Sequence, residues 1–352
     1  MRIIILSCWK PLGPHFYVFP VWIYSAGVLI VFLTLAASAQ GPTTNVPVAG
    51  SNLLALSFSE GRNTAPVVWE GGQDSGSLGH PRGCGMEYRA GYRWDLPVDL
   101  SDQGDVSAQH IGAGMTTRLP WNKALIVSLD VDVDYVSYSF SVDEDSLFDT
   151  PGLMRNAADV RIGPMLAGRI NKRWSWMAKV TGAFTGETDA DAWKSFNAGM
   201  LAGAGYTVNP KLKLVLAVVT SSMLADQPLV FPIIGFDWMP NDRLRVATRG
   251  PGLDIIMKLT PETTLTVKGR WEYRRYHLDE DRAPEPGGIF RDQRVNAGIE
   301  LSRRFYRRVE LTLEAGTSVY QQFKLENSDE DTIERINTDP EAYLGAKVSV
   351  NL

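Results

Sequence analysis

The chain contains little cysteine, little histidine and, after its first 40 residues, no long apolar run. Two cysteines occur among 352 residues, Cys8 and Cys84. We expect Cys8 to be removed with an export signal, so the mature chain keeps one thiol and cannot form an internal disulfide or a cysteine-based metal site. No later apolar stretch reaches the roughly 18–20 residues that a membrane-spanning helix needs. These absences exclude a disulfide scaffold and a helical membrane protein.

The chain also lacks a cluster of positive charge and a histidine-based catalytic group. Its 35 lysines and arginines and 40 aspartates and glutamates give a formal net charge of −5 and are spread along the sequence. Nucleic-acid-binding proteins carry a basic patch, so no nucleic-acid partner is expected. His80, His110 and His277 lie in three separate segments, and no serine–histidine pair can be assembled around them. We predict a protein that is not an enzyme, with no catalytic residues, no metal site and no cofactor.

The first 39 residues have the pattern of a secretion signal. Basic residues near the start precede an apolar core at Val28–Leu35, and Ala37-Ser38-Ala39 gives the small-x-small pattern of a cleavage site. The alternative is an uncleaved anchor, because the stretch Phe16–Leu35 is long and apolar. Residues 40–85 are rich in glycine, serine, proline and asparagine, and we expect a flexible periplasmic lead or a small plug there.

The segment from Ala124 to Phe140 gives the clearest sign of a β-strand. It reads ALIVSLDVDVDYVSYSF. Alternate residues of a strand point to opposite faces. One face therefore carries Leu129, Val131, Val133 and Tyr135, and the other carries Asp130, Asp132 and Asp134. A soluble core does not place three carboxylates behind so long an apolar face, whereas a wall between lipid and water needs both faces.

The same two-faced pattern recurs from Met86 to the last residue. Further apolar sets begin at Tyr88, Ile111, Trp174, Leu265, Leu311 and Leu344. These runs are long enough for membrane strands, which take about 9–11 tilted residues. The sequence therefore predicts an all-β, transmembrane, antiparallel up-and-down β-barrel over residues 86–352.

The connections between these runs are of two kinds. Short, turn-rich links occur at Pro120–Lys123, Asn171–Arg173, Asn209-Pro210, Pro240–Asp242, Pro261-Glu262 and Tyr306-Arg307. Longer polar links are expected at Ser141–Asn156, Glu187–Asp191, Asp279–Arg291 and Asn327–Pro340. Outer-membrane barrels have short periplasmic turns and long extracellular loops. If Arg249–Gly252 is a turn between two short strands, there are about 14 strands with both ends on the periplasmic side; the alternative is about 12.

Tryptophans near the expected strand ends favour a membrane barrel. Trp121, Trp174, Trp238 and Trp271 lie where aromatic girdles would meet the two interfaces. The alternative is that they fill the core of a soluble β-sandwich. Sandwich strands are usually shorter, and sandwich loops do not sort by length.

Charged residues that alternate with the apolar sets would line the lumen. The candidates are Asp130, Asp132, Asp134, Arg118, Arg161, Arg169, Lys268, Arg270, Glu272, Arg274, Glu310 and Glu314. Adjacent carboxylates on one strand face lie about 7 Å apart and repel by roughly 2 kcal/mol at an effective dielectric constant of about 20. They need water, cations or arginine partners on neighbouring strands. Either these charges orient polar solutes in an open pore, or they pair with one another and only stiffen or block the barrel.

Three short segments resemble a known family. They are Gly235–Asn241, Arg249–Leu253 and the closing strand Ala342–Val348. On these residues the chain resembles bacterial outer-membrane β-barrel proteins, and it is similar to a family of secreted barrels of unknown function. The resemblance implies a location in the bacterial outer membrane and insertion by the barrel-assembly machinery, but no reaction. The chain departs from many such barrels in ending with Leu352 and not with phenylalanine.

We expect a passive outer-membrane channel for small solutes, surrounded by outer-membrane lipid and lipopolysaccharide. One alternative is a closed structural or surface-recognition barrel without transport. A further alternative is a channel for apolar molecules, in which Leu53–Leu56 plugs the lumen and an opening in the wall releases the solute to lipid.

Overall fold

The structure is a computed structural model that describes residues 85–100, 104–122, 124–142, 147–149, 154–222, 229–281, 286–306, 308–328 and 330–352. The expected signal segment, the lead with Leu53–Leu56, Cys84 and His80 lie outside the described residues. Within the described part of the chain, no helix has the length and apolar character needed to span a membrane.

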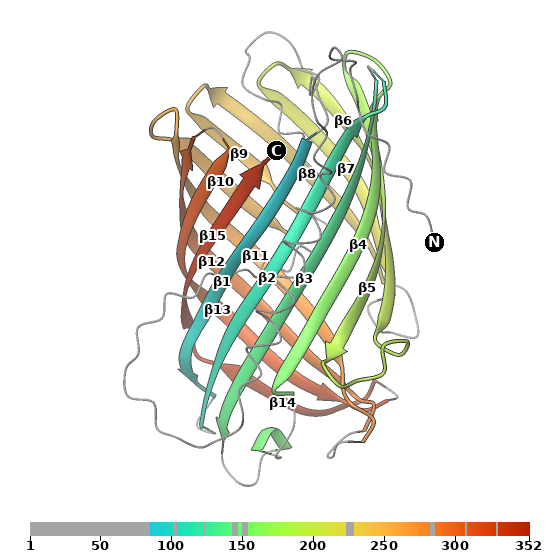
Figure 1. Ribbon diagram of the computed structural model, residues 1–352, viewed down its shortest axis with the longest axis vertical. Helices are drawn as coiled ribbons and strands as arrows, with labels where there is room; N and C mark the ends of the chain where they lie inside the picture. Colours follow the sequence, from blue (N-terminus) through green and yellow to red (C-terminus); the bar gives the residue numbers. More distant parts are fainter. Residues whose placement is uncertain are drawn as a thin grey trace, which may run out of the picture. The chain divides into compact units, whose positions relative to one another are not determined.

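The described residues form one closed antiparallel β-barrel (Figure 1). Its strands are β1 (Gly85–Asp99), β2 (Gly104–Pro120), β3 (Leu125–Val142), β4 (Asn156–Arg169), β5 (Trp174–Glu187), β6 (Phe196–Asn209), β7 (Leu212–Ser221), β8 (Leu229–Asn241), β9 (Leu244–Thr248), β10 (Gly252–Lys258), β11 (Thr263–His277), β12 (Ile289–Phe305), β13 (Val309–Glu326), β14 (Thr332–Thr338) and β15 (Glu341–Asn351), with a short 3-10 helix, η1 (Leu147–Asp149).

Neighbours in sequence pair around the ring, and β15 pairs with β1 to close it. The C-terminal part of β13 pairs with β14 and its N-terminal part with β15, so these two strands share one position in the wall. The 15 strands therefore occupy 14 positions, which confirms the predicted count of about 14.

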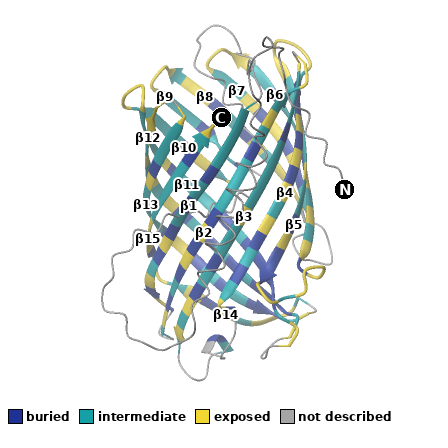
Figure 2. Ribbon diagram, in the orientation of Figure 1, coloured by how far each residue is buried: buried dark blue, intermediate teal, exposed yellow. Residues whose placement is uncertain are grey.

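The faces of the strands follow the alternation in the sequence. In β3, Val133 on the outer face is 41% exposed, whereas Tyr138 on the inner face is buried. Outer-face residues such as Ile162, Leu216 and Leu313 are also exposed in the chain by itself. Figure 2 shows this exchange of buried and exposed positions along the strands. The result is an apolar exterior around an interior that contains most of the charges, as a membrane barrel requires.

The two ends of the barrel differ as predicted. All six predicted short links join strands at one end, which we call the turn end. Asparagine side chains shape several of them: Asn122 Oδ1 accepts hydrogen bonds from the backbone N–H groups of Ala124 and Leu125, and Asn171 and Asn241 make the same contacts. The start of β1 and the C-terminus lie at this end too, because Leu352 N–H donates to Met86 O over 2.8 Å.

The opposite end, the loop end, differs from the prediction in three places. The link expected at Glu187–Asp191 extends to Ser195, because β6 begins at Phe196. The segment Asn327–Pro340 was expected to be one polar link, but it contains β14, whose Ile336 is buried against the interior. The expected link Asp279–Arg291 is shorter than predicted because β12 begins at Ile289. The errors at β14 and at the start of β12 arise because charged residues on the outer face at the loop end mask the strand pattern.

The wall is not uniform around the barrel. Arg249-Gly250-Pro251 forms the predicted turn between β9 and β10, and both strands are short. They lie near the end of the barrel where the C-terminus is marked in Figure 1. The ladder between β8 and β9 stops at Asp237, and the ladder between β10 and β11 stops at Arg270. Nearer the loop end, β11 pairs directly with β5 through His277 and Gly186, which brings the ring together again.

Candidate functional site

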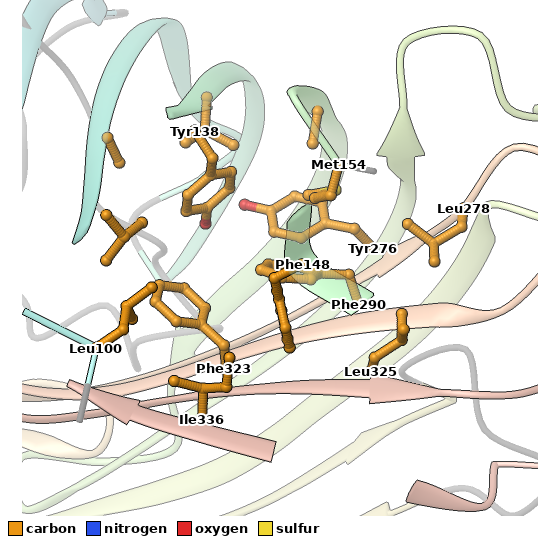
Figure 3. Packing of buried hydrophobic residues seen from close by; sticks show 14 of the residues in the cluster. Leu100, Tyr138, Phe148, Met154, Tyr276, Leu278, Phe290, Phe323, Leu325 and Ile336 are labelled. Carbon is orange, nitrogen blue, oxygen red and sulfur yellow. The ribbon is translucent and has the colours of Figure 1, made fainter. Parts of the chain in front are cut away.

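The lumen near the loop end is filled by apolar side chains, which we call the outer cluster. Its aromatic members come from β3, η1, β11, β12 and β13 and point toward one another (Figure 3). They are Tyr138, Phe140, Phe148, Tyr276, Phe290 and Phe323. The Phe290 and Phe323 rings lie 5.5 Å apart, and both side chains are fully or almost fully buried. A cluster this well packed blocks the axis of the barrel at this level.

Below the outer cluster lies a set of buried charges, which we call the central network. Arg294 Nη1 lies 2.6 Å from Asp95 Oδ2, and a second guanidinium nitrogen of Arg294 donates to Asp292. Asp95 also accepts from Arg93 Nε over 2.6 Å. Tyr138 donates its hydroxyl to Asp292 Oδ2 over 2.8 Å and so links the network to the outer cluster. Arg294, Asp95 and Asp292 have essentially no exposed surface. Charges this deeply buried are tolerated only when they are paired and hydrogen-bonded.

His110 occupies the centre of this network as a neutral connector. Its Nδ1 lies 3.1 Å from Arg274 Nη1 and its Nε2 lies 2.9 Å from Asp95 Oδ2. Arginine can only donate, so Nδ1 accepts and the ring proton sits on Nε2, where it is donated to Asp95. His110 is therefore fully used in positioning Arg274 and Asp95.

A small cavity lies beside the central network, toward the turn end. It measures about 70 Å³ and its charged lining residues are Arg89, Arg93, Asp132, Asp134, Asp159, Arg161, Glu300, Glu314 and Lys347. A space of this size holds a few water molecules.

The structure places the twelve candidate lumen residues on the inner face, most of them in contact with an opposite charge. Asp130 accepts from Lys179 Nζ and Asp132 accepts from Arg89, each over 2.7–2.8 Å. Further ion pairs of the candidates are Arg118–Glu87, Arg161–Asp159, Lys268–Glu314, Arg270–Asp254, Arg274–Glu272 and Arg304–Glu310. Asp134 lines the cavity, and Arg169 lies near the turn end on β4. The candidates do not form one continuous ladder: they divide among several local clusters.

Sequence reasoning missed several members of these clusters. Lys179 alternates with the outward set that begins at Trp174, so its inward position was readable from the strand pattern. Asp292 directly follows the segment Asp279–Arg291, which was predicted as a loop although β12 begins at Ile289, and it was not among the candidates. The apposition of Asp95 and Arg294, which are 199 residues apart, had no sequence signal.

A second part of the inner wall is apolar, and we call it the apolar patch. It runs across β4 to β8 and consists of Met165, Ala167, Met177, Leu201, Val215, Val219 and Ile233. Neighbouring inward positions carry small residues such as Gly203 and Ala217. The patch ends at Ile233 on β8, the strand that borders the short strands β9 and β10.

Beside the apolar patch the backbone ladder of the wall is interrupted. On the side of β8 that faces β9, residues 229–235 have no backbone partner among the described residues, over about 23 Å of strand. On the facing side of β11, the same holds for residues 272–276. Pro232 lies on this free edge of β8, and proline is found at sheet edges because it cannot donate to a ladder. We call this feature the wall interruption.

On the loop-end side of the wall interruption, the link between β5 and β6 contacts the link between β11 and β12 through charged residues. Lys194 Nζ donates to Glu280 Oε1 over 2.6 Å, which raises the pKa of Lys194 and lowers the pKa of Glu280. The backbone N–H groups of Lys194 and Trp193 donate to Asp191 and lower the pKa of its carboxyl group. No group of three or more metal-ligating side chains occurs among the described residues.

The fold resembles solved outer-membrane proteins at low sequence identity. The COG4313 outer membrane channel from Pseudomonas putida F1 is 11% identical with a TM-score of 0.46, and the alignment covers 80% of this chain and 100% of that chain. The P. putida toluene transporter TodX is 10% identical with a TM-score of 0.40, over 77% of this chain and 90% of that chain. A Pseudomonas aeruginosa FadL homologue is 12% identical with a TM-score of 0.40, over 76% and 89%. These similarities concern the fold alone.

In sequence, no curated protein matches the chain. A family model described as "Domain of unknown function (DUF6268)" matches residues 121–351. The match runs from the first short turn to the closing strand and includes all three segments that carried the resemblance. Because it covers more than half of the 352 residues, the chain belongs to the DUF6268 family, and its fold is a closed antiparallel β-barrel.

Proposed function

We propose that this protein is an outer-membrane channel for small apolar molecules, which pass between the lumen and the surrounding hydrocarbon through the wall interruption. The wall interruption carries the proposal, because its β8 edge lies beside the apolar patch. Its other edge, residues 272–276 of β11, includes the ion-paired Glu272 and Arg274. Ile233 belongs to both features: it is part of the patch and lies on the free edge of β8. An apolar solute that follows the patch therefore reaches the edge of the wall.

The alternative routes through the described part of the barrel are less favourable for a solute. The outer cluster fills the axis near the loop end, and the central network occupies the level below it. The cavity of about 70 Å³ has nine charged residues in its lining and is too small for a general pore. A route along the apolar patch requires no buried ion pair to separate, and separating one would be costly.

The location in the outer membrane is part of this proposal. The exterior of the barrel is apolar, the charges are mostly inside, and turns and loops are sorted between the two ends. This arrangement supports insertion with the turn end toward the periplasm and the loop end outside.

The test compares uptake of an apolar fluorescent probe by cells that express the protein and by cells with an empty vector. Wild type is expected to raise the initial uptake rate several-fold. Ile233→Asp places a carboxylate at the edge of the patch and is expected to return uptake to the vector level. Lys347→Gln, which changes the inner face beside the cavity, is the control and is expected to behave as wild type. Heat-modifiable gel migration checks that each variant is folded.

A second candidate function is a closed structural barrel. The filled outer cluster and the paired central network support it, because they leave little open space in that part of the lumen. If folded wild type leaves apolar uptake at the vector level and gives no ion conductance in planar bilayers, the structural role replaces the proposed one. A steady conductance that Lys347→Gln alters would instead identify a polar pore.

A further inference from the structure

Four cationic residues form a row on the outer face of the barrel at the loop end. Arg275 on β11 lies directly opposite Arg291 on β12, Arg291 lies opposite Lys324 on β13, and Lys324 lies opposite Arg335 on β14. We call these four residues the cationic row. Each alternates with inward residues of the outer cluster, such as Tyr276, Phe290 and Phe323, and so points outward.

The register of this row is unfavourable unless anions accompany it. Like charges directly opposite one another on neighbouring strands destabilise a sheet. Here three successive cross-strand pairs bring cations together, and the guanidinium of Arg291 also lies over the Tyr273 ring, 5.3 Å from its centre. A row of this kind therefore needs negative charge from nearby groups or from a ligand.

Two carboxylates of the protein supply part of that charge. Glu326 accepts from Arg275 Nη2 over 3.0 Å and from Arg291 Nη2 over 2.5 Å, and Glu330 lies 3.3 Å from Arg275 Nη2. Both carboxylates therefore pair with the two arginines of the row. Among the described residues, no carboxylate forms an ion pair with Lys324 or Arg335, so four cations face two anions.

The arginine side chains also retain unused donors. Arg275 is 5% exposed, and its Nε is buried without a hydrogen-bond partner among the described residues. The Nε of Arg291 is likewise buried without a hydrogen-bond partner among the described residues. A buried donor without a partner is costly, and a bound acceptor would satisfy it.

The position of the row relates it to the membrane surface. The outer face of β12 and β13 carries the apolar residues Ile299, Leu301 and Leu313. Nearer the loop end, Tyr320 on β13 and Trp271 on β11 form a level of aromatic side chains. Val295 on β12 lies at this aromatic level, and Arg291 lies four residues nearer the loop end. Four residues correspond to about 13 Å along the strand, or about 10 Å along the barrel axis for a strand tilt of about 40°. The row therefore lies just above the apolar band and its aromatic girdle, where lipid head groups begin.

We propose that the cationic row binds the phosphate groups on the saccharide head of lipopolysaccharide. Guanidinium groups match phosphate oxygens with two parallel hydrogen bonds, and these charge-assisted contacts are the strong ones. A phosphate held here leaves the attached acyl chains beside the apolar band below. The proposal depends on the placement of the loop end outside the cell, but not on transport.

The test uses the full-length protein purified in detergent and native mass spectrometry with diphosphorylated lipid A. Lys324→Gln/Arg335→Gln removes the two cations without a carboxylate partner and leaves the Glu326 contacts intact. This double variant is expected to bind lipid A at least about tenfold more weakly, because two charge-assisted contacts are lost. Arg303→Gln removes an exposed outward cation from the turn end of β12 and is expected to bind as wild type.

Two further arms identify the source of the phosphate. Lipid A without phosphates is expected to bind wild type at least about tenfold more weakly than diphosphorylated lipid A. Inorganic phosphate at equal concentration is expected not to displace the lipid. Equal binding of both lipids, unchanged binding by the folded double variant, or displacement by inorganic phosphate would each overturn the proposal. Failure of apolar uptake in the cell assay would leave it standing, so the two proposals are tested separately.

Discussion

The central network and the apolar patch lie on the same kind of strand, but the first is stabilised by pairing of buried charges and the second by apolar packing. In the central network every buried charge has been brought against a partner from a distant part of the chain, such as Arg294 against Asp95. The apolar patch has no such requirement, since its side chains need only be apolar and of modest size. The first region therefore depends on specific partners, whereas the second depends only on apolar packing and is the route proposed for a solute.

This comparison bears on the proposed passage, because the central network and the proposed route occupy different parts of the barrel. Moving a solute through the central network would separate ion pairs in a dry interior. Moving it along the apolar patch replaces one apolar contact with another. The wall interruption lies next to the apolar patch, so the proposed route and the free edge of β8 are in the same part of the barrel.

The largest expected effect comes from breaking the central network. Arg294→Met leaves Asp95 and Asp292 buried without their main partner and is expected to lower the free energy of unfolding by about 3–5 kcal/mol. Arg304→Gln at the exposed pair with Glu310 is the control, expected to cost about 0–1 kcal/mol. Urea unfolding in detergent, followed by heat-modifiable migration, measures both. Equal losses would mean that the network does not depend on its specific partners.

The outer cluster and the apolar patch should differ in their tolerance of truncation. Phe290→Ala removes a fully buried ring and is expected to cost about 3–4 kcal/mol, whereas Leu201→Ala in the patch is expected to cost about 2 kcal/mol. The same unfolding assay applies. A larger loss for Leu201→Ala would show that the patch is packed as tightly as the outer cluster and is a poor route for a solute.

The charged candidates of the lumen should have little influence on ion currents. Asp132→Ala removes a half-exposed partner of Arg89, and Arg270→Ala leaves Asp254 paired with Arg249. Each is expected to lower stability by about 1 kcal/mol or less and to leave single-channel currents unchanged. A changed current in either variant would favour the open polar pore over the apolar route.

The smallest effect concerns the loops above the wall interruption. The contact between Lys194 and Glu280 is complete at pH values between the ordinary pKa values of glutamate and lysine. It is lost as the pH falls through the lowered pKa of Glu280, or rises through the raised pKa of Lys194. Amide exchange of the two loops is expected to rise at both extremes. Glu280→Gln should remove the acid-side change, and its persistence would exclude this pair as the cause.

Much of the fold was predictable because a membrane wall imposes a strict two-residue period. The alternation of Leu129 to Tyr135 with three aspartates identified β3, and five of the six short turns followed from their asparagine and proline residues. β14 was missed because its outer face at the loop end is polar, which removes the contrast on which the prediction depends. The shortness of β9 and β10 could be read from Arg249–Gly252, but its consequence for the wall could not.

The candidate site was less predictable, because partners are chosen by register around the ring and not by distance along the chain. The sequence indicated that Asp130 needs a cation, and the structure supplies Lys179 from two strands away.

The amino-acid sequence by itself determined that this chain is a two-faced β wall with short turns at one end, because local periodicity and turn chemistry are properties of neighbouring residues. Only the tertiary structure decided which charges meet inside, where the wall is interrupted, and that four cations line up at the loop end. These depend on strand register and on the closure of the ring, which join residues that the sequence keeps far apart.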